Sequence, residues 1–299
     1  MISSRPCPIC STTDGELIVE SNLNPRNISD KELSDLFVGL RANQSFFPYL
    51  RCKKCQLCYN KEYFSQDALA ELYKNMPPNL VFDEERNVKE THKSYADYIV
   101  DNHDRSESLI ELGADSGFVT EQIISKFVIN KGTIVEPNLK VRPVLERILK
   151  GKDFEIVNYL DESDLNGQYD LFIAVHVLDH LLDPYSDLLK ISNSMKTGGK
   201  AFIVVHNQKS FLAKILRKKW PPYCLQHPQI FDDGSIEILL SKAGYYDIKI
   251  FRTKNRVSIK NLISMLFEIL RVPRFLLRLV PDMSIDLYLG NILVSARKI

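Results

Sequence analysis

Four cysteines near the start of the chain have a spacing that could bind a metal ion. Cys7 and Cys10 form one C-x-x-C corner, Cys52 and Cys55 form a second, and Cys58 follows three residues later. Two such corners can place four thiolates around Zn²⁺ in a tetrahedron, with zinc–sulfur distances of about 2.3 Å and no open position. In a reducing compartment, paired corners indicate metal ligands rather than disulfides. We therefore predict a structural zinc site formed by Cys7, Cys10, Cys52 and Cys55.

The two corners are separated by a long insert. It holds 41 residues between Cys10 and Cys52, whereas roughly 15 to 20 is usual. Doubling a loop costs only about 0.6 kcal/mol of closure entropy, which is small beside the roughly 10 to 16 kcal/mol of structural zinc binding. The insert therefore does not exclude the site. Two alternatives stay open: free, partly buried thiols, and a site in which Cys58 replaces Cys55.

A glycine turn between a predicted strand and a predicted helix could bind a nucleoside. Residues 108–117 read SLIELGADSG, and apolar residues then recur at helical spacing over 118–128. Glycine at Gly113 and Gly117 lets the backbone approach a ligand closely, and the helix N-terminus offers unpaired N–H groups. Glu136, 23 residues after Gly113 at the end of the next predicted strand, would accept hydrogen bonds from ribose hydroxyls. The alternative is an ordinary strand–turn–helix unit with a solvated glutamate.

One residue of this turn discriminates between ligands. Asp115 occupies the position at which a dinucleotide-binding turn has its second glycine. A carboxylate there would repel a pyrophosphate, whereas the sulfonium and ammonium groups of S-adenosylmethionine would tolerate it. The turn therefore favours S-adenosylmethionine over NAD or FAD.

Beyond this turn, the chain resembles the class I S-adenosylmethionine-dependent methyltransferases in five segments that follow the family's order. The segments are ELGADSG at 111–117, VEPN at 135–138, YDLFIAVHVLDHLLDP at 169–184, MKTGGKAFIVVHN at 195–207 and HPQIFDDGSIEILLSKAGY at 227–245. The resemblance implies an α/β fold with a Rossmann-like, seven-stranded, mostly parallel sheet and helices on both faces. Its antiparallel seventh strand would be residues 291–296.

The resemblance also implies which residues hold the methyl donor. Glu111, Gly113 and Gly117 would lie at its methionine end, and Glu136 at its ribose. Asp161, in the segment NYLDE, lies where the family often has an acidic residue near the adenine.

The cysteine-rich segment is similar to the zinc-binding segment that precedes the methyltransferase domain in a subgroup acting on sugars and other small metabolites. The second corner of that subgroup reads C-x-x-C-G-L, and this chain has CKKCQLC, with Gln56 at the glycine position. Ribosomal RNA methyltransferases with a terminal zinc ribbon are a competing comparison, but their cysteine corners lie closer together. The resemblance therefore implies a small-molecule acceptor, such as a nucleotide-linked sugar.

Histidines at strand ends could act as general bases. Methyl transfer depends on holding donor and acceptor in line, and a base is needed only if the acceptor must lose a proton. His176 and His206 follow predicted strands at the edge where such sheets bind ligands, and His227 begins the last of the five segments. We predict His176 or His227 as the base; the alternative is that both only shape the pocket. A further alternative places His176, Asp179 and His180 on one helical face as metal ligands.

The predicted elements divide the chain into two parts. The proline-containing segment 75–80 is the predicted boundary between a zinc-binding module with a helical insert, over 1–75, and a methyltransferase domain over 76–299. In the module, the capping box of Ser29 and Glu32 predicts a short helix. Beyond the boundary, strands are predicted near 108–112, 132–136, 154–157, 170–175, 200–205 and 246–252.

An insertion over 257–281 is predicted to be helical, with an apolar stripe followed by arginines. Such a helix could lie on a membrane surface, on a partner protein or on a second copy of the chain. The alternative is that it packs against its own domain.

Composition restricts the functional class. The 39 basic and 38 acidic residues nearly cancel, so no overall field attracts nucleic acid. The start MISSRPCPIC lacks a basic stretch followed by an apolar run, and no apolar run reaches about 18 residues. We therefore expect a cytoplasmic protein without a transmembrane segment. The sequence predicts a methyltransferase for a small metabolite, with a non-catalytic methyltransferase-like binding protein and an RNA methyltransferase as alternatives.

Overall fold

A seven-stranded sheet forms the centre of the computed structural model, which describes residues 2–21, 23, 27–37, 45–74, 85–163, 165, 169–270, 273, 277–278 and 280–299. Its strands are β6 (Ser108–Leu112), β7 (Lys131–Val135), β8 (Asp153–Val157), β9 (Tyr169–Val175), β10 (Met195–His206), β12 (Tyr245–Arg252) and β15 (Asn291–Lys298). They lie in the order β12-β15-β10-β9-β6-β7-β8. Strand β15 is antiparallel to both neighbours, and the pairs from β10 to β8 are parallel. The predicted fold class and its antiparallel seventh strand are confirmed.

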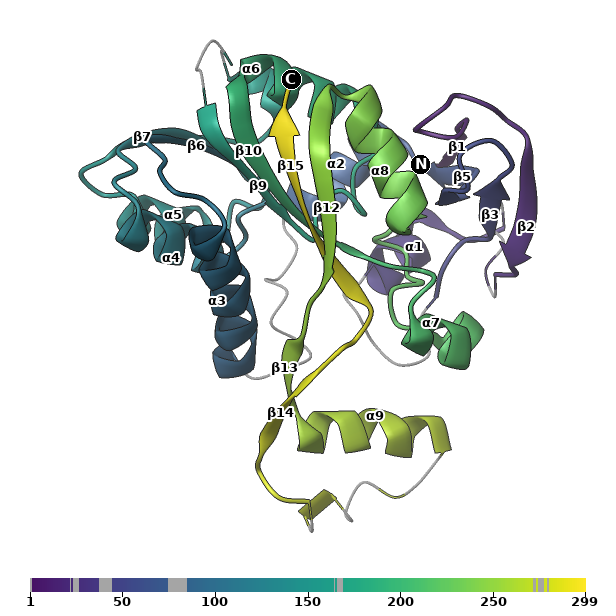
Figure 1. The fold of residues 1–299 in the computed structure, drawn as a ribbon. Coiled ribbons are helices and arrows are strands. Elements are labelled where there is room, and N and C mark those ends of the chain that lie inside the picture. Colours follow the sequence, from purple (N-terminus) through teal and green to yellow (C-terminus); the bar gives the residue numbers. More distant parts are fainter. Residues whose placement is uncertain are drawn as a thin grey trace.

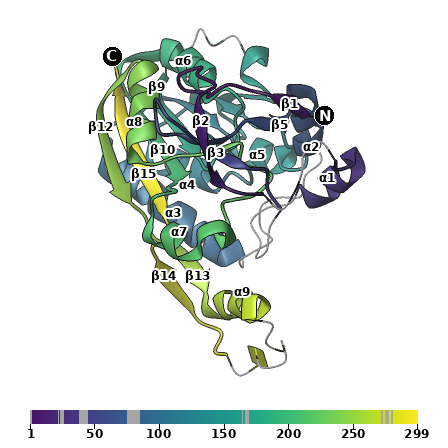
Figure 2. The same ribbon diagram turned by 90° about the vertical axis from the view of Figure 1, so that its right-hand side faces the viewer.

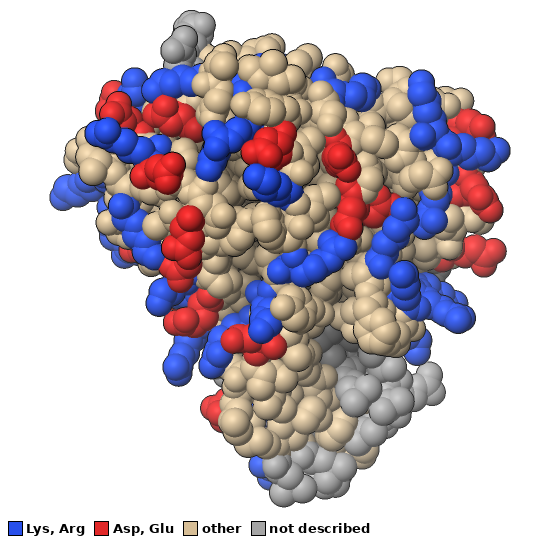
Figure 3. All heavy atoms as spheres, in the orientation of Figure 1, with Lys and Arg blue, Asp and Glu red and all other residues tan. Residues whose placement is uncertain are grey.

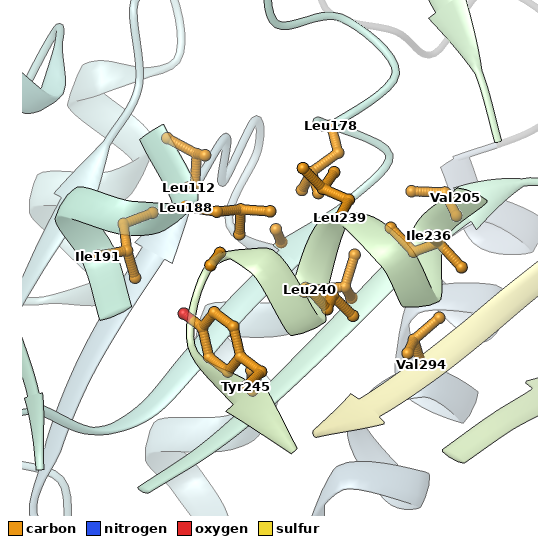
Figure 4. Packing of buried hydrophobic residues seen from close by; sticks show 14 of the residues in the cluster. Leu112, Leu178, Leu188, Ile191, Val205, Ile236, Leu239, Leu240, Tyr245 and Val294 are labelled. Atoms are coloured by element: carbon orange, nitrogen blue, oxygen red, sulfur yellow. The ribbon is translucent and has the colours of Figure 1, made fainter. Parts of the chain in front are cut away.

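Helices cover both faces of this sheet (Figure 1). The helices α3 (Glu85–Asp101), α4 (Phe118–Lys126) and α5 (Arg142–Ile148) cover one face, and α6 (Pro184–Ser194) and α8 (Asp233–Lys242) cover the other. Because successive strand residues point to opposite faces, Leu109 packs toward α3 and α4, whereas Ile110 packs toward α6 and α8. Figure 4 shows the second of these layers, with Leu188 of α6 and Leu239 of α8 over the sheet.

The helices α4, α6 and α8 differ in how their first turns are capped. Asp183 caps α6 by accepting a hydrogen bond from the Ser186 N–H at 3.1 Å, and Asp232 forms a capping box with Ser235 at the start of α8. Helix α4 instead begins after Gly117, which has no side chain with which to cap it. The first N–H groups of α4 are therefore available to a ligand.

The amino-terminal part forms a second sheet that includes a strand from the other end of the chain. Its strands are β2 (Gly15–Val19), β3 (Tyr49–Cys52), β4 (Cys58–Asn60) and β11 (Gln229–Ile230), in the order β11-β4-β3-β2, and β1 (Ile2–Ser4) pairs with β5 (Glu62–Phe64). Two helices accompany them, α1 (Asp30–Leu36) with the predicted capping box and α2 (Gln66–Lys74). Strand β11 is contributed by the region after the predicted boundary. That boundary, at 75–80, lies outside the described residues.

The insertion near the carboxyl terminus contains strands as well as a helix. The helix α9 (Ile259–Leu270) is flanked by β13 (Asn255–Ser258) and β14 (Ser284–Leu287), which pair as an antiparallel ribbon. The sequence predicts only the helical part. Figures 1 and 2 show α9 at the end of this ribbon, away from the central sheet. Among the described residues, no helix is long and apolar enough to cross a membrane.

Charged side chains of both signs are mixed over the face of the molecule drawn in Figure 3. Several are paired across elements, including Arg252 with Asp233 at 2.6 Å and Arg256 with Asp286 at 3.2 Å. The described part of this face therefore lacks the continuous basic stripe that binds a nucleic-acid backbone.

Candidate active site and metal site

The turn between β6 and α4 requires glycine at two positions. Gly113 and Gly117 have φ values of +68° and +71°, a region that residues with a Cβ rarely adopt. A Cβ on Gly113 would also lie 2.4 Å from Cγ2 of Val177, which follows β9. The loop after β9 therefore packs directly on the glycine turn.

Gly113→Ala tests this packing. We expect it to destabilise the protein by about 1–3 kcal/mol for the backbone strain, and further for the clash with Val177. Gly151→Ala is the matched control, because Gly151 has a φ of +83° but a Cβ there would meet no atom of the described residues within 4 Å. Urea unfolding measures both; equal losses of unfolding free energy would contradict a specific contact with Val177.

Glu136 is held beside the turn by two backbone donors. Its Oε2 accepts the N–H of Asp115 and its Oε1 accepts the N–H of Asn138, each at 2.8 Å. Burial raises the pKa of Glu136 to about 7, and the two N–H groups only partly offset that effect. A carboxylate has about four lone-pair directions. After these two hydrogen bonds, the carboxylate has about two lone-pair directions left for further donors.

Glu111 lies beneath the same turn and is fully enclosed. Its Oε2 accepts a hydrogen bond of 2.6 Å from Thr120 Oγ1, which ties β6 to the first turn of α4. Burial is the main cause that raises the pKa of Glu111 to about 7. Glu111 therefore contacts the first turn of α4. The family resemblance implies that this turn lies near the methionine end of the donor.

Asp161 is exposed, whereas Glu136 is buried. It lies in the short helix η1 (Leu160–Glu162) after β8, with its side chain 80% exposed. Its Oδ1 forms an ion pair of 2.5 Å with Lys190 of α6. A role near the adenine would require this exposed pair to separate, which costs little because such pairs contribute at most about 1 kcal/mol.

Four histidines meet at the carboxyl ends of β9 and β10. The ring centroids of His176 and His206 are 4.6 Å apart, those of His206 and His227 are 5.1 Å apart, and those of His227 and His180 are 4.6 Å apart. Both predicted bases, His176 and His227, therefore belong to one cluster, connected through His206. Burial lowers the pKa of all four rings, for His206 to about 4. Burial therefore favours the uncharged form of each ring.

Hydrogen bonds identify the nitrogen of His227 that could accept a proton. Its Nδ1 lies 2.7 Å from the carbonyl oxygen of Pro222. Because a carbonyl can only accept, Nδ1 carries the ring proton and Nε2 has the lone pair. In the neutral ring, His227 Nε2 is therefore the nitrogen that can accept a proton.

The predicted metal-binding helical face is wrong. Residues 176–180 form a turn instead of a helix, and the three groups brought within 4.8 Å of one another are His176, Asp179 and His206. Asn291 bridges both rings, with Oδ1 at 2.8 Å from His206 Nδ1 and Nδ2 at 3.3 Å from His176 Nε2. An amide that donates to His176 Nε2 leaves the ring proton on Nδ1, which then has no lone pair for a metal. We interpret this group as a hydrogen-bonded cluster.

Comparison with known proteins agrees with this arrangement of sheet, turn and strand ends. Residues 84–250, more than half of the chain, match a family model described as a methyltransferase domain. The chain belongs to the methyltransferase-domain family. A comparison with curated proteins found no match.

Solved structures with the same fold share little sequence with this methyltransferase domain. A methyltransferase of Haloferax volcanii, solved with a methyltransferase activator, has 13% identity and a TM-score of 0.50, over 71% of this chain and 92% of that chain. An S-adenosylmethionine-dependent methyltransferase of Thermotoga maritima has 13% identity and a TM-score of 0.48, over 72% of this chain and 90% of that chain. At this identity the likeness concerns the fold alone.

The four predicted zinc ligands meet beside the methyltransferase domain. The Sγ atoms of Cys7 and Cys55 are 3.4 Å apart, as are those of Cys10 and Cys52, and all four lie within 4.8 Å of one another. A tetrahedral zinc site with 2.3 Å bonds separates its sulfurs by about 3.8 Å. The four thiols therefore fit zinc with only small shifts. Cys58 is buried in β4 in another cluster, with Tyr49 and Trp220.

The amino-terminal module also contacts the histidine cluster of the methyltransferase domain. The Oη of Tyr73, in α2, lies 2.8 Å from Nδ1 of His180. Sequence reasoning missed Tyr73, which is 107 residues from His180, and it missed Asn291. Neither has a local signal, because a single tyrosine in a helix or an asparagine at a strand start is common.

Proposed function

We propose that this protein is an S-adenosylmethionine-dependent methyltransferase that acts on a small metabolite. The observation that carries the proposal is Glu136, a buried carboxylate held by two backbone N–H groups beside a glycine turn that opens α4. Such a carboxylate suits the two ribose hydroxyls of a nucleoside. The methyltransferase-domain family supports the reaction class.

The place of each residue in the fold suggests which part of S-adenosylmethionine it would contact. Glu136 would bind the ribose, and the turn from Gly113 to Gly117 would approach the methionine end, with Glu111 beneath it. Asp161 would reach the adenine after release from Lys190. When bound, S-adenosylmethionine supplies a methyl group that is electrophilic because it is carried by a positive sulfur.

The histidine cluster is the proposed acceptor side. The loop after β9 connects it to the glycine turn, because Val177 packs on Gly113 and is next to His176. His227 Nε2 would take the proton of an acceptor hydroxyl, amine or carbon acid. A neutral imidazole in a buried site can take that proton without first losing one. His176, the other predicted base, would instead shape the pocket, because its Nε2 lone pair already accepts from Asn291. A nucleotide-linked sugar is the acceptor class that the cysteine-rich segment favours.

Zinc would have a structural role. Four cysteines fill a tetrahedral site and leave no position open for a substrate. The Cys site packs in the same core cluster as residues of α6 and α8, so zinc would hold the module against the methyltransferase domain. The cytoplasm stays the predicted location, and the insertion over 257–281, which includes α9, stays the predicted contact for a partner protein or a second copy.

Calorimetric titration of S-adenosylmethionine into the purified, zinc-loaded protein tests the proposal. We expect one site with micromolar affinity. Absence of binding would favour a non-catalytic protein with the same fold. Binding of RNA that weakens steeply with salt would favour an RNA methyltransferase.

The pH dependence of donor binding follows from Glu136. Its pKa of about 7 means that the ionised form, which accepts from both ribose hydroxyls, gains population as pH rises through 7. We expect affinity for S-adenosylhomocysteine to rise about tenfold from pH 6 to pH 8 if only the ionised form binds. Calorimetry at both pH values measures this change; a constant or falling affinity would contradict it.

A further inference from the structure

Three tyrosines of the amino-terminal module contact the segment that leads to His227. Tyr49 Oη donates to the carbonyl oxygen of His227 at 2.7 Å, and Tyr63 Oη donates to that of Leu225 at 2.5 Å. Both of these contacts are to backbone, so they fix the path of the chain. Tyr73 differs, because its closest partner is the ring nitrogen Nδ1 of His180 at 2.8 Å.

The hydrogen atoms at Tyr73 can be assigned from its two contacts. Its Oη lies 2.8 Å from His180 Nδ1 and 3.4 Å from the carbonyl oxygen of Gln226. Since the carbonyl can only accept, one arrangement satisfies both contacts: His180 Nδ1–H donates to Tyr73, and the phenol O–H donates to Gln226. The lone pair of His180 is then on Nε2. Tyr73 therefore selects one tautomer of His180.

The ring of His180 in turn contacts the ring of His227. Their centroids are 4.6 Å apart and their planes are nearly perpendicular, at 82°. His227 is held through Nδ1 by the Pro222 carbonyl, and the His180 ring packs against it. Two contacts therefore set the plane of the His227 imidazole: the hydrogen bond at Nδ1 and the packing of the His180 ring. The orientation of His180 depends in turn on Tyr73.

The geometry points to Tyr73 as a positioning residue: it holds His180 in the Nδ1–H tautomer, and His180 orients the proposed base His227. The inference rests on the proposed function for the role of His227. Its consequence is that the cysteine-rich module completes the acceptor side of the methyltransferase domain. Removal of the Tyr73 hydroxyl, in α2 of the module, would then change the tautomer of His180 in the methyltransferase domain.

Histidine NMR on the full-length, zinc-loaded protein tests this inference. Long-range ¹H–¹⁵N correlation spectra at pH 7 distinguish the two neutral tautomers, and loss of signals in His180→Asn assigns His180. We expect wild-type His180 to be predominantly the Nδ1–H form. Tyr73→Phe should lose that preference and gain the Nε2–H form, and the His227 ring signals should shift with it.

Tyr63→Phe is the matched control, because it removes a neighbouring hydroxyl that donates to a backbone carbonyl. It should leave the His180 tautomer unchanged. An Nε2–H tautomer of His180 in the wild type, or the same His180 spectrum in Tyr73→Phe, would overturn the inference. The first of these outcomes needs no folded Tyr73→Phe variant. The NMR samples contain neither S-adenosylmethionine nor a methyl acceptor. Their result is therefore independent of the titration with S-adenosylmethionine.

Discussion

Cys52→Ser is expected to abolish zinc binding and to lower the melting temperature by at least about 10 °C. Structural zinc contributes roughly 10 to 16 kcal/mol to the folding of small zinc domains, and 1 kcal/mol shifts the melting temperature of a domain of this size by about 2–4 °C. Cys52 ends β3, and its Sγ lies 3.4 Å from that of Cys10. A serine hydroxyl is a poor substitute for a thiolate. Metal analysis and thermal unfolding measure the two effects.

The effect should extend to the histidine cluster. Strand β3 pairs with β4, and β4 pairs with β11, which begins two residues after His227. Cys58→Ser is the matched control, because Cys58 is buried in β4 but belongs to a different cluster from the four thiols. It should retain one zinc per chain. Zinc retained by Cys52→Ser, or lost from Cys58→Ser, would contradict the predicted ligand set.

Glu136→Gln is expected to weaken the binding of S-adenosylmethionine by about 10- to 150-fold at pH 8. Hydrogen bonds to a charged group contribute about 1.5–3 kcal/mol, which corresponds to that range of affinity. The two oxygens of Glu136 accept from different N–H groups, those of Asp115 and Asn138. A glutamine must therefore place its NH₂ group against one of these donors, which also disturbs the turn. Calorimetry of wild type and variant measures the change.

Asp170→Asn separates the loss of ligand contacts from a general loss of stability. Asp170 Oδ2 also accepts two backbone N–H groups, those of Glu107 and Ser108, at 3.1 and 3.2 Å. It lies at the start of β9, at the opposite edge of the sheet from Glu136. We expect donor affinity within about twofold of wild type. Equal weakening in both variants would contradict a direct role for Glu136.

Much of the fold and half of the candidate site follow from local sequence patterns. Residue spacing predicts six strands of the central sheet, the turn from Gly113 to Gly117 and the capping box of Ser29 and Glu32, and the structure confirms them. Such features depend on neighbours within a few residues. In any chain, a glycine allows a positive φ, and a serine three residues before a glutamate can form a capping box. The seventh strand is implied by the family resemblance and is confirmed as well.

The rest was decided by contacts between residues far apart in the chain. Strand β11 adds to the sheet of the cysteine-rich module, and the ribbon of β13 and β14 carries α9 away from the sheet. His206 joins His176 to His227, and Tyr73 reaches His180 from α2. A local pattern specifies that a side chain is buried or polar, but it does not specify its partner.

The chemical groups can be identified from the amino-acid sequence: the glycine turn, the acids at the strand ends, the histidines and the four cysteines. How these groups combine depends on the folded chain, in which His180 contacts Tyr73 of the module and Asp179 accepts the backbone N–H of His206 at 3.0 Å. The physical reason is that hydrogen bonds and ring contacts depend on distances of a few ångströms. Those distances are set by how the two sheets pack, which no single segment encodes.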